Sequence, residues 1–444
     1  MMKRDFFTIK KIDVTKWMII PRERLERLFI IRKRTIVKVF LYITVLIVVY
    51  GSLNPWFMWP ISRYYYFLAA LPISACLLLD RNIQDRLFVG TKWQWPYLTC
   101  LIISLVIVLV NAGNILGLLR AVISTLPFYA VFRLRRNELM NLSDFMAKTL
   151  AVLMCISIPF YVMFLLGYPL PHYHIANKEL MYSYENYTFF LLDDRAALSL
   201  IPRFHSVFLE PGHLGTFSAF MLMAQIGRWG KWYNVILFVT TFMTFSLAAY
   251  VLLAMILFIS AWVRRKAILG KIIFLISLLA AVVVVSLFYN KGENMVNGLI
   301  VQRLTIDDEG RLTGDNRVTE TFEKEFNKFI VSDDLLLGKE YKALKYGWGN
   351  SGFRVFMYDF GLISLLFVLA FYTAVSLNCH DRRVAISMWI IFLSSFLVRA
   401  TPLYFYYFLP LFLFTRLDLG LLVENKEKCA EEDNLIKLGE NYNA

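Results

Sequence analysis

The thirty residues 234–263, "NVILFVTTFMTFSLAAYVLLAMILFISAWV", decide how the chain is folded. A membrane crossing needs roughly 20 predominantly apolar residues, so this stretch is too long for one ordinary helix and short for two. Lysine and arginine in short loops mark the cytoplasmic side of a membrane. A single crossing would leave the basic cluster "RRK" at 264–266 outside. We therefore predict two short helices with a break near Ser246, which returns the cluster to the inner side.

The composition of the whole chain agrees with a membrane environment. Of 444 residues, 58% are hydrophobic and only 18% are charged, which is more apolar surface than a water-soluble core can enclose. The apolar residues form blocks such as "IIFLISLLAAVVVVSLF" at 272–288 instead of alternating with polar ones. This pattern predicts transmembrane helices and argues against a transmembrane barrel.

We expect an all-α polytopic membrane protein with about twelve membrane segments, one pair of them short or broken. The predicted segments lie near 36–53, 63–79, 96–112, 114–132, 149–168, 211–227, 234–263 as a broken pair, 270–289, 353–376, 384–399 and 402–417.

Charge predicts how this bundle is oriented. Residues 1–35 carry eleven basic and four acidic side chains, a net +7 that is half of the chain's +14. We expect a basic cytoplasmic segment at 1–35, a membrane domain at 36–417 and a polar cytoplasmic tail at 418–444. The long polar loops 169–210 and 290–352 then lie outside. Basic and aromatic residues are not interleaved in a soluble module, which argues against nucleic-acid binding.

Three stretches of the second half follow one another in a specific order. "RFHSVFLEPGHLGTFSAF" at 203–220 precedes "TFMTFSLAAYVLLAMI" at 241–256, and a third runs from "TGDNRVTETFEKEF" at 313–326 to "GNSGFRVFMYDFGLISLL" at 349–366. Their order and spacing resemble those of Wzy-type O-antigen and capsular polysaccharide polymerases and the related O-antigen ligases. The resemblance extends over 203–376, about two fifths of the chain.

The resemblance implies a GT-C-like membrane glycosyltransferase of the bacterial inner membrane. Such an enzyme transfers a growing glycan from undecaprenyl diphosphate onto the next lipid-linked repeat unit at the outer face, without a cofactor. A Wzz-like chain-length co-polymerase and a flippase are the implied partners. Ligases carry a histidine before the asparagine of the third stretch, whereas Trp348 and Gly349 precede Asn350 here. This difference favours a polymerase and leaves Asn350 as a substrate-binding candidate.

Arginines of the outer loops are candidates for holding the donor diphosphate, because guanidinium groups stay charged and bind phosphate bidentately. Arg203 and Arg317 are the catalytic candidates, with Arg303 in support; Arg311 has acidic neighbours at 307–309. The alternative is that each is a solvated loop arginine paired with a nearby carboxylate. Arg120 lies inside the fourth predicted span, where a charge is costly. It either reaches the lipid diphosphate or pairs with a carboxylate such as Asp359.

Glu210 is the candidate for orienting or deprotonating the acceptor hydroxyl. It immediately precedes Pro211, which suits the first position of a helix. The alternative is a helix cap without chemistry. His205 and His213 either share the proton transfer and bind substrate or form a hydrogen-bonding scaffold. No metal-ligand spacing accompanies them.

Two further patterns concern the outer loops. Phe322, Phe326 and Ile330 recur at four-residue spacing, which predicts an amphipathic helix over 316–330 capped by Asp315. His172 and His174, beside the aromatic "YSYENYTFF" at 182–190, indicate interfacial hydrogen bonding more than a metal site. The aromatic residues either form an interfacial belt or stack on sugar rings.

The nearest alternative function is an O-antigen ligase that moves finished glycan to lipid A core. A lipid-linked glycan flippase or another transporter is the alternative from a different class. A transporter would distribute charged groups through several spans and often has related halves. The concentration of polar residues in two outer loops favours surface chemistry.

Overall fold

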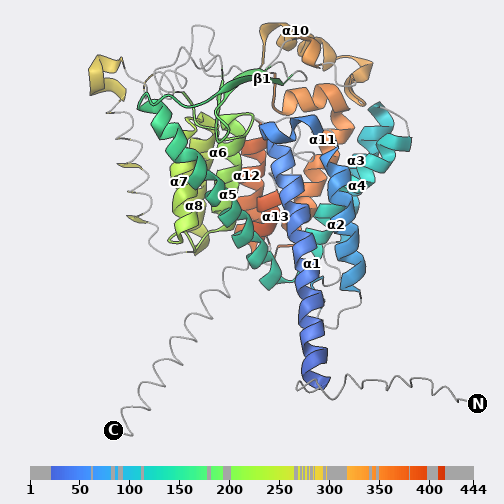
Figure 1. Ribbon diagram of the computed structural model, residues 1–444. Coiled ribbons are helices and arrows are strands. Elements are labelled where there is room, and N and C mark those ends of the chain that lie inside the picture. Colours follow the sequence, from blue (N-terminus) through green and yellow to red (C-terminus); the bar gives the residue numbers. More distant parts are fainter. Residues whose placement is uncertain are drawn as a thin grey trace, which may run out of the picture.

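The computed structural model describes residues 22–61, 64–81, 86–88, 94–111, 115–177, 182–193, 202–264, 318–339, 343–346, 350–379, 381–397 and 409–415, with scattered positions between 269 and 297. These residues form a bundle of helices with a small sheet and a short amphipathic helix, α10, at one end (Figure 1). The chain is mostly helical, as predicted. The predicted spans 270–289 and 402–417 are described only in part, the second over 409–415.

Most helices of the bundle lie within a few residues of the predicted segments, but the first begins at Arg22 instead of near 36 and the fifth at Arg136 instead of near 149. They are α1 (Arg22–Leu53), α2 (Tyr65–Asp80), α3 (Gln94–Asn111), α4 (Ile115–Arg133), α5 (Arg136–Leu165), α6 (Pro211–Ala224), α7 (Trp232–Met243), α8 (Leu247–Arg264), α11 (Phe353–Leu377), α12 (Arg382–Phe396) and α13 (Leu409–Thr415). Outside the bundle lie α10 (Glu320–Phe329) and the 3-10 helices η2 (Trp56–Ile61), η4 (Tyr289–Gly292), η7 (Asp333–Leu335) and η8 (Ala343–Tyr346).

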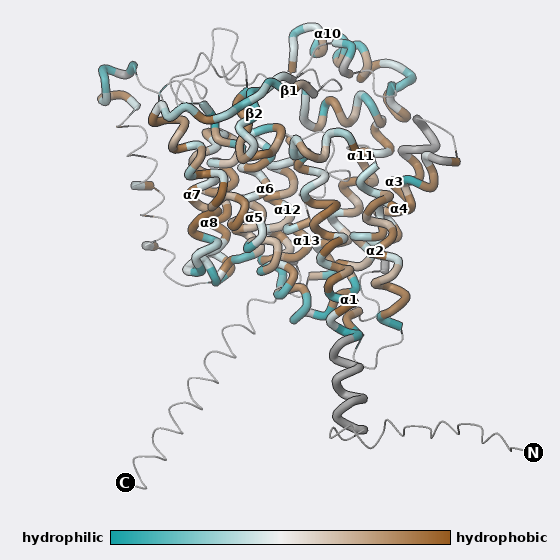
Figure 2. The backbone as a smooth tube through the Cα atoms, viewed as in Figure 1, coloured by the Kyte–Doolittle hydropathy of each residue, from teal (hydrophilic) through white to brown (hydrophobic). Residues whose placement is uncertain are grey.

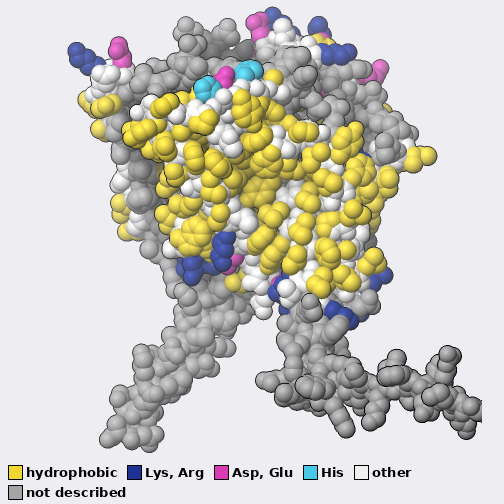
Figure 3. Space-filling model, in the orientation of Figure 1, with side chains coloured by type: hydrophobic (Ala, Val, Ile, Leu, Met, Phe, Trp, Pro, Cys, Tyr) yellow, Lys and Arg dark blue, Asp and Glu magenta, His cyan; other side chains and the backbone are white. Residues whose placement is uncertain are grey.

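Four helical stretches are long and apolar enough to cross a membrane, as judged by length and composition among the described residues. They are Lys33–Leu53, Asn137–Leu165, Leu247–Arg264 and Phe353–Leu377. Hydrophobic residues dominate the middle of the bundle (Figure 2), and on the visible face they form a broad band with charged side chains near its two ends (Figure 3). This distribution is the pattern of a membrane protein. The count of twelve segments and the GT-C fold stay predictions.

The predicted break near Ser246 is confirmed. Helix α7 ends at Met243 and α8 begins at Leu247, and Phe245 between them has a φ of 45°. A residue in this left-handed region cannot continue a right-handed helix. The helix is therefore interrupted here, and two helices of 12 and 18 residues take the place of one continuous helix.

Helix α6 lies at the centre of the bundle. Every residue from Leu214 to Ala224 is buried, because α6 packs against α5, α7, α8 and α13. A helix that is apolar on all sides is expected in such a position. The start of α6 at Pro211 is therefore the point where the first long loop enters the protein interior.

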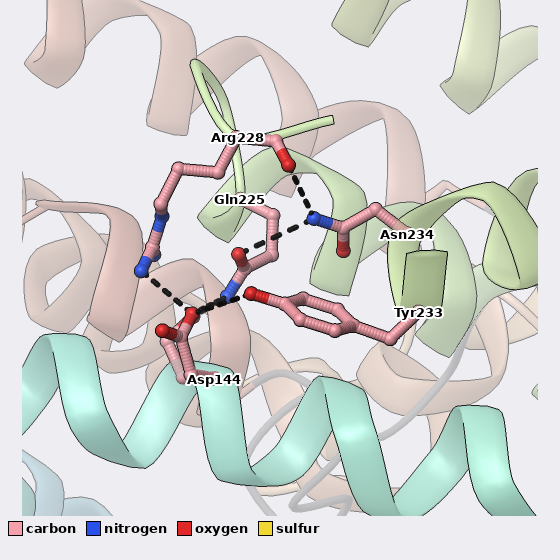
Figure 4. A network of polar contacts seen from close by, with 6 residues as sticks. Asp144, Gln225, Arg228, Tyr233 and Asn234 are labelled. Atoms are coloured by element: carbon pink, nitrogen blue, oxygen red, sulfur yellow. Dashed lines mark hydrogen bonds and ion pairs between the residues drawn. The ribbon is translucent and has the colours of Figure 1, made fainter. Parts of the chain in front are cut away.

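A hydrogen-bonded network fixes the other end of α6 (Figure 4). Asp144 of α5 accepts hydrogen bonds at Oδ1 from Arg228 at 2.6 Å, Gln225 at 3.1 Å and Tyr233 at 3.2 Å. Asn234 donates to the Arg228 carbonyl at 2.9 Å. One carboxylate thus joins α5, the α6–α7 connection and the start of α7, and Gln225 Nε2 also donates to the Ser143 hydroxyl of α5 at 2.7 Å.

The first long loop folds into an antiparallel meander of β1 (Tyr173–Asn177), β2 (Tyr182–Asn186) and β3 (Leu191–Asp193), in the order β1-β2-β3. His174 of β1 lies opposite Glu185 of β2, with their Nδ1 and Oε1 atoms 3.3 Å apart. His172 Nε2 lies 3.9 Å from Glu185 Oε2. His174 therefore hydrogen-bonds the Glu185 carboxylate, whereas the Nδ1 atom of His172 lies 3.1 Å from the Leu170 carbonyl oxygen.

The amphipathic helix of the second loop exists, but its predicted boundaries and cap are wrong. Helix α10 begins at Glu320, and the Thr319 hydroxyl caps it by accepting a hydrogen bond from the Phe322 amide. The predicted cap Asp315 lies outside the described residues. Ile330 is 41% exposed because α10 ends at Phe329. Phe329 completes the buried face with Phe322 and Phe326, and this face packs on Tyr358 of α11.

Helix α11 is interrupted at Gly361, whose φ and ψ are 80° and 170°. The segment after η7 supplies the hydrogen bonds that the break removes. The Lys339 amide donates to the Tyr358 carbonyl at 2.7 Å, and the Ile363 amide donates to the Leu336 carbonyl at 3.3 Å. The second long loop is thereby fixed to the membrane domain by backbone hydrogen bonds.

Candidate functional site

The segment 202–210 leads the first loop into α6, and its backbone is held from several directions. The Ser206 carbonyl accepts from the Leu191 amide at 2.8 Å, and the Val207 carbonyl accepts from the Trp56 amide at 3.1 Å. The Leu209 carbonyl accepts from the Tyr184 hydroxyl at 2.7 Å. The Pro202 carbonyl accepts from the Tyr161 hydroxyl, and the Phe204 amide donates to the Met243 carbonyl at 3.1 Å. Because β2, β3, η2, α5 and α7 all contribute partners, this segment is fixed although it is a loop.

A sharp turn lies within the segment. Ser206 has a φ of 54°, and its buried hydroxyl lies 2.6 Å from the hydroxyl of Ser157 on α5. This hydrogen bond holds the left-handed conformation, which costs a non-glycine residue free energy. The turn lies between His205 and Glu210, and the charges of both Arg203 and Glu210 act on the His205 imidazole.

Glu210 occupies the N-cap position of α6, and Pro211 is the first helical residue, as predicted. The Glu210 side chain makes no capping hydrogen bond. Its Oε2 atom lies 3.7 Å from Nε2 of His213, and the two side chains are 31% and 12% exposed. Glu210 therefore occupies the cap position without a capping hydrogen bond from its side chain. A carboxylate and an imidazole lie side by side at the entrance to α6.

Arg203 lies at the break between α7 and α8. Its Nε–H donates to the Thr244 carbonyl at 3.1 Å, just past the last residue of α7. A guanidinium at this position also interacts favourably with the carbonyl end of the helix dipole. This contact fixes the orientation of the guanidinium, so Arg203 has a structural role in addition to any role toward a ligand.

His205 is buried inside the bend, with only 2% of its surface exposed. Burial lowers the pKa of His205 to about 4, and the nearby charge of Arg203 acts in the same direction. The Phe208 carbonyl, which accepts from Nδ1 at 2.5 Å, and the carboxylates of Asp193 and Glu210 oppose this shift. The imidazole is neutral near pH 7 with its proton on Nδ1, which favours the scaffold interpretation over proton transfer.

Acid should destabilise the protein through His205. Since the folded pKa is about 4 and the ordinary value is 6.5, the unfolded chain binds more protons between these values. The resulting stability is complete above pH 6.5 and is lost as pH falls toward 4, at up to about 1.4 kcal/mol per pH unit. His205→Asn, whose amide can donate the same hydrogen bond without titrating, should flatten the pH profile of the melting temperature in detergent. His174→Asn, on the exposed sheet, should not; equal profiles for all three proteins would contradict the assignment.

The other predicted site residues lie in different places. The Arg120 guanidinium lies over the Tyr66 ring, 5.2 Å from its centroid. The Asp359 carboxylate accepts from the Ala343 amide at 3.0 Å, and no ion pair joins Arg120 to Asp359 in the described part of the chain. Oδ1 of Asn350 accepts from the Thr319 amide at 2.7 Å, which fixes the start of α10. Residues 303, 311 and 317, the remaining arginine candidates, lie outside the described residues.

The structure adds residues that the sequence analysis missed. Trp56, Tyr184 and Tyr161 fix the carbonyls of the 202–210 segment, and Asp193 at the end of β3 acts electrostatically on His205. The contribution of α5 could have been predicted from the sequence, because Ser157 and Tyr161 are polar residues four positions apart in an apolar span and therefore share one helix face. No comparable sequence pattern predicted the pairing of β2 and β3 or the contact of Trp56 with the 202–210 segment.

No metal centre is found among the described residues: no three side chains of His, Cys, Asp or Glu come close enough together to hold an ion. No protein-family model, curated protein or solved structure matches the chain. The candidate site is therefore defined by its own geometry. It consists of Arg203, His205, Glu210 and His213 around the bend that opens α6, with Asp193 beside them.

Proposed function

We propose that the chain is a polytopic membrane glycosyltransferase that polymerises undecaprenyl-diphosphate-linked oligosaccharide repeat units. The product is an O-antigen or capsular polysaccharide, made at the outer face of the bacterial inner membrane, with both termini of the enzyme in the cytoplasm. The observation that carries the proposal is the carboxylate of Glu210, held beside His213 at the entrance to α6 without a capping hydrogen bond to the helix. The resemblance of residues 203–376 to Wzy-type polymerases supports the same activity.

The proposed chemistry is a displacement at the anomeric carbon of the donor glycan. The acceptor hydroxyl of the next lipid-linked repeat attacks this carbon, and the bond between the carbon and the diphosphate oxygen breaks. Glu210 orients the hydroxyl and accepts its proton, and the diphosphate leaves with the electron pair of the broken bond. The glycosyl diphosphate bond supplies the energy, so the reaction needs no nucleotide or other cofactor.

Negative charge that develops on the leaving diphosphate needs fixed positive charge. Arg203 has a guanidinium oriented by the end of α7 and precedes Glu210 in the fixed 202–210 segment. Arg317 and Arg303 of the second loop complete the proposed set. Arg120 and Asn350 remain proposed substrate contacts, although the Asn350 oxygen also supports α10.

The competing functions give different products from the same material. Purified protein in vesicles should convert a labelled lipid-linked repeat unit into a ladder of longer lipid-linked saccharides. A ligase would form no ladder and would transfer glycan only when lipid A core is added. A flippase would move the repeat unit across the bilayer without lengthening it. Absence of any longer saccharide would overturn the proposal.

A further inference from the structure

The end of α6 opposite the candidate site carries a basic surface that the proposed activity does not use. Four cationic side chains from three parts of the fold gather there: Lys148 of α5, Arg228 and Lys231 of the α6–α7 connection, and Arg264 of α8. Asp144 is the carboxylate of the network around Arg228, so these five side chains carry a net charge of +3. Lys and Arg side chains gather at the lower edge of the hydrophobic band (Figure 3).

The cationic side chains converge on the start of α7. Lys148 is exposed and its Nζ lies 5.7 Å from the centroid of the Tyr233 ring. Lys231 is exposed and immediately precedes α7. Arg264 packs over Gly227, with its Cζ 3.7 Å from the position of a Cβ at that glycine. Gly227 has a φ of 94°, which lets the connection fold back beneath Arg264.

Apolar side chains continue from this basic surface along the two helices. On α7 the exposed residues Trp232, Val235, Val239 and Phe242 recur at three- and four-residue spacing and thus form one stripe. On α5 the exposed residues Val152 and Ile156 follow Lys148 at four-residue spacing. Since α5 and α7 pack against each other, both stripes begin at the same cluster of positive charge.

We infer that this surface binds an anionic phospholipid. The phosphate group would lie among Lys148, Lys231 and Arg264, and the acyl chains would extend along the exposed stripes of α5 and α7. Charge complementarity favours an anionic headgroup, because basic residues at the surface of a bilayer attract lipids of net negative charge more strongly than zwitterionic ones. Trp232, exposed between Lys231 and the apolar stripe, has the amphipathic ring typical of the headgroup level.

The bound lipid would stabilise the same junction that Asp144 holds. Lys148, one turn after Asp144 on α5, contacts the Tyr233 ring, and the Tyr233 hydroxyl donates to Asp144. A phosphate that neutralises the repulsion among the cationic side chains therefore favours the packed arrangement of α5 and α7. The expected consequence is a higher melting temperature in the anionic lipid, independent of glycan synthesis.

The test uses the full chain in nanodiscs that contain equal amounts of phosphatidylglycerol and phosphatidylcholine. Native mass spectrometry after release should detect retained phosphatidylglycerol in clear excess over phosphatidylcholine. The double variant Lys148→Gln, Lys231→Gln should reduce this selective retention by about 30-fold and remove the thermal stabilisation by phosphatidylglycerol. The control Lys324→Gln, Lys328→Gln changes two exposed lysines of α10 and should retain both properties.

Two outcomes would overturn the inference. Equal retention of the two lipids by the unmodified protein would show that the surface has no preference for an anionic headgroup, and this measurement needs no variant. Equal loss of selectivity in the α10 control would show a general effect of net charge. Both readouts are independent of polymerase activity, so they leave the proposed function untouched.

Discussion

Replacing Glu210 by glutamine is expected to stop chain growth and to leave single repeat units in place of long glycan. The substitution keeps the size of the side chain and removes the negative charge that would accept the proton of the acceptor hydroxyl. Loss of a general base typically lowers a rate by about 10²- to 10⁴-fold. Because the Glu210 side chain makes no capping hydrogen bond to α6, the protein should still fold and reach the membrane.

The glycan ladder on a denaturing gel measures this effect in cells that lack the native gene. Glu185→Gln is the matched control, because Glu185 lies on the sheet beside two histidines, as Glu210 lies beside His213. It should give a normal ladder. Arg317→Ala, which removes a proposed diphosphate contact, should give single repeats like Glu210→Gln. Normal ladders from both Glu210→Gln and Arg317→Ala would refute the assignment of the site.

Replacing Gly361 by alanine is expected to prevent stable folding. The backbone of Gly361 has a φ of 80°, and a Cβ there would overlap the Leu336 carbonyl oxygen. The facing Gly338 has a φ of 85°, and its Cβ would lie 2.5 Å from the Gly361 amide nitrogen. Neither backbone can move without breaking the hydrogen bonds that join the second loop to α11. Conformational strain and overlap together should cost about 3–5 kcal/mol.

The variant Gly167→Ala distinguishes conformational strain from atomic overlap as the cause of the lost stability. Its φ is also 80°, but no atom lies within 4 Å of the position that a Cβ would take. Gly167→Ala should therefore show strain alone, about 1–2 kcal/mol. Melting temperature in detergent and resistance to limited proteolysis measure both variants. Similar losses for Gly361→Ala and Gly167→Ala would mean that the contact between residues 336–338 and α11 contributes little.

Local patterns in the sequence predicted most helices, because each apolar block has to satisfy its backbone hydrogen bonds within itself in a membrane. The break near Ser246 followed from length and charge, and the position of Pro211 followed from its fixed φ. The boundaries of α10 could not be predicted from the sequence pattern. The apolar residue Ile330 fitted the spacing as well as Phe329, and only the actual end of the helix decides between them.

The candidate site was predicted in part. Arg203, His205, Glu210 and His213 are close in sequence, so one bend brings them together. The role of each depended on partners that are remote in sequence. The carbonyl of Thr244 orients Arg203, and burial beneath the sheet keeps His205 neutral. No spacing rule connects residues 54–56, 184–191 and 240–244 to the segment 202–210.

The sequence by itself determined the class of protein, the succession of apolar helices and the broken pair at 234–263, since these depend on hydrophobicity, charge and chain length. Only the tertiary structure decided that α6 is central, that the Glu210 side chain makes no capping hydrogen bond to it, and that the second loop is joined to α11 at Gly338 and Gly361. The physical reason is that burial and hydrogen-bond partners are properties of pairs of segments. The sequence of a segment shows which hydrogen-bond donors and acceptors it has. The segments that pack against it determine which of them are paired.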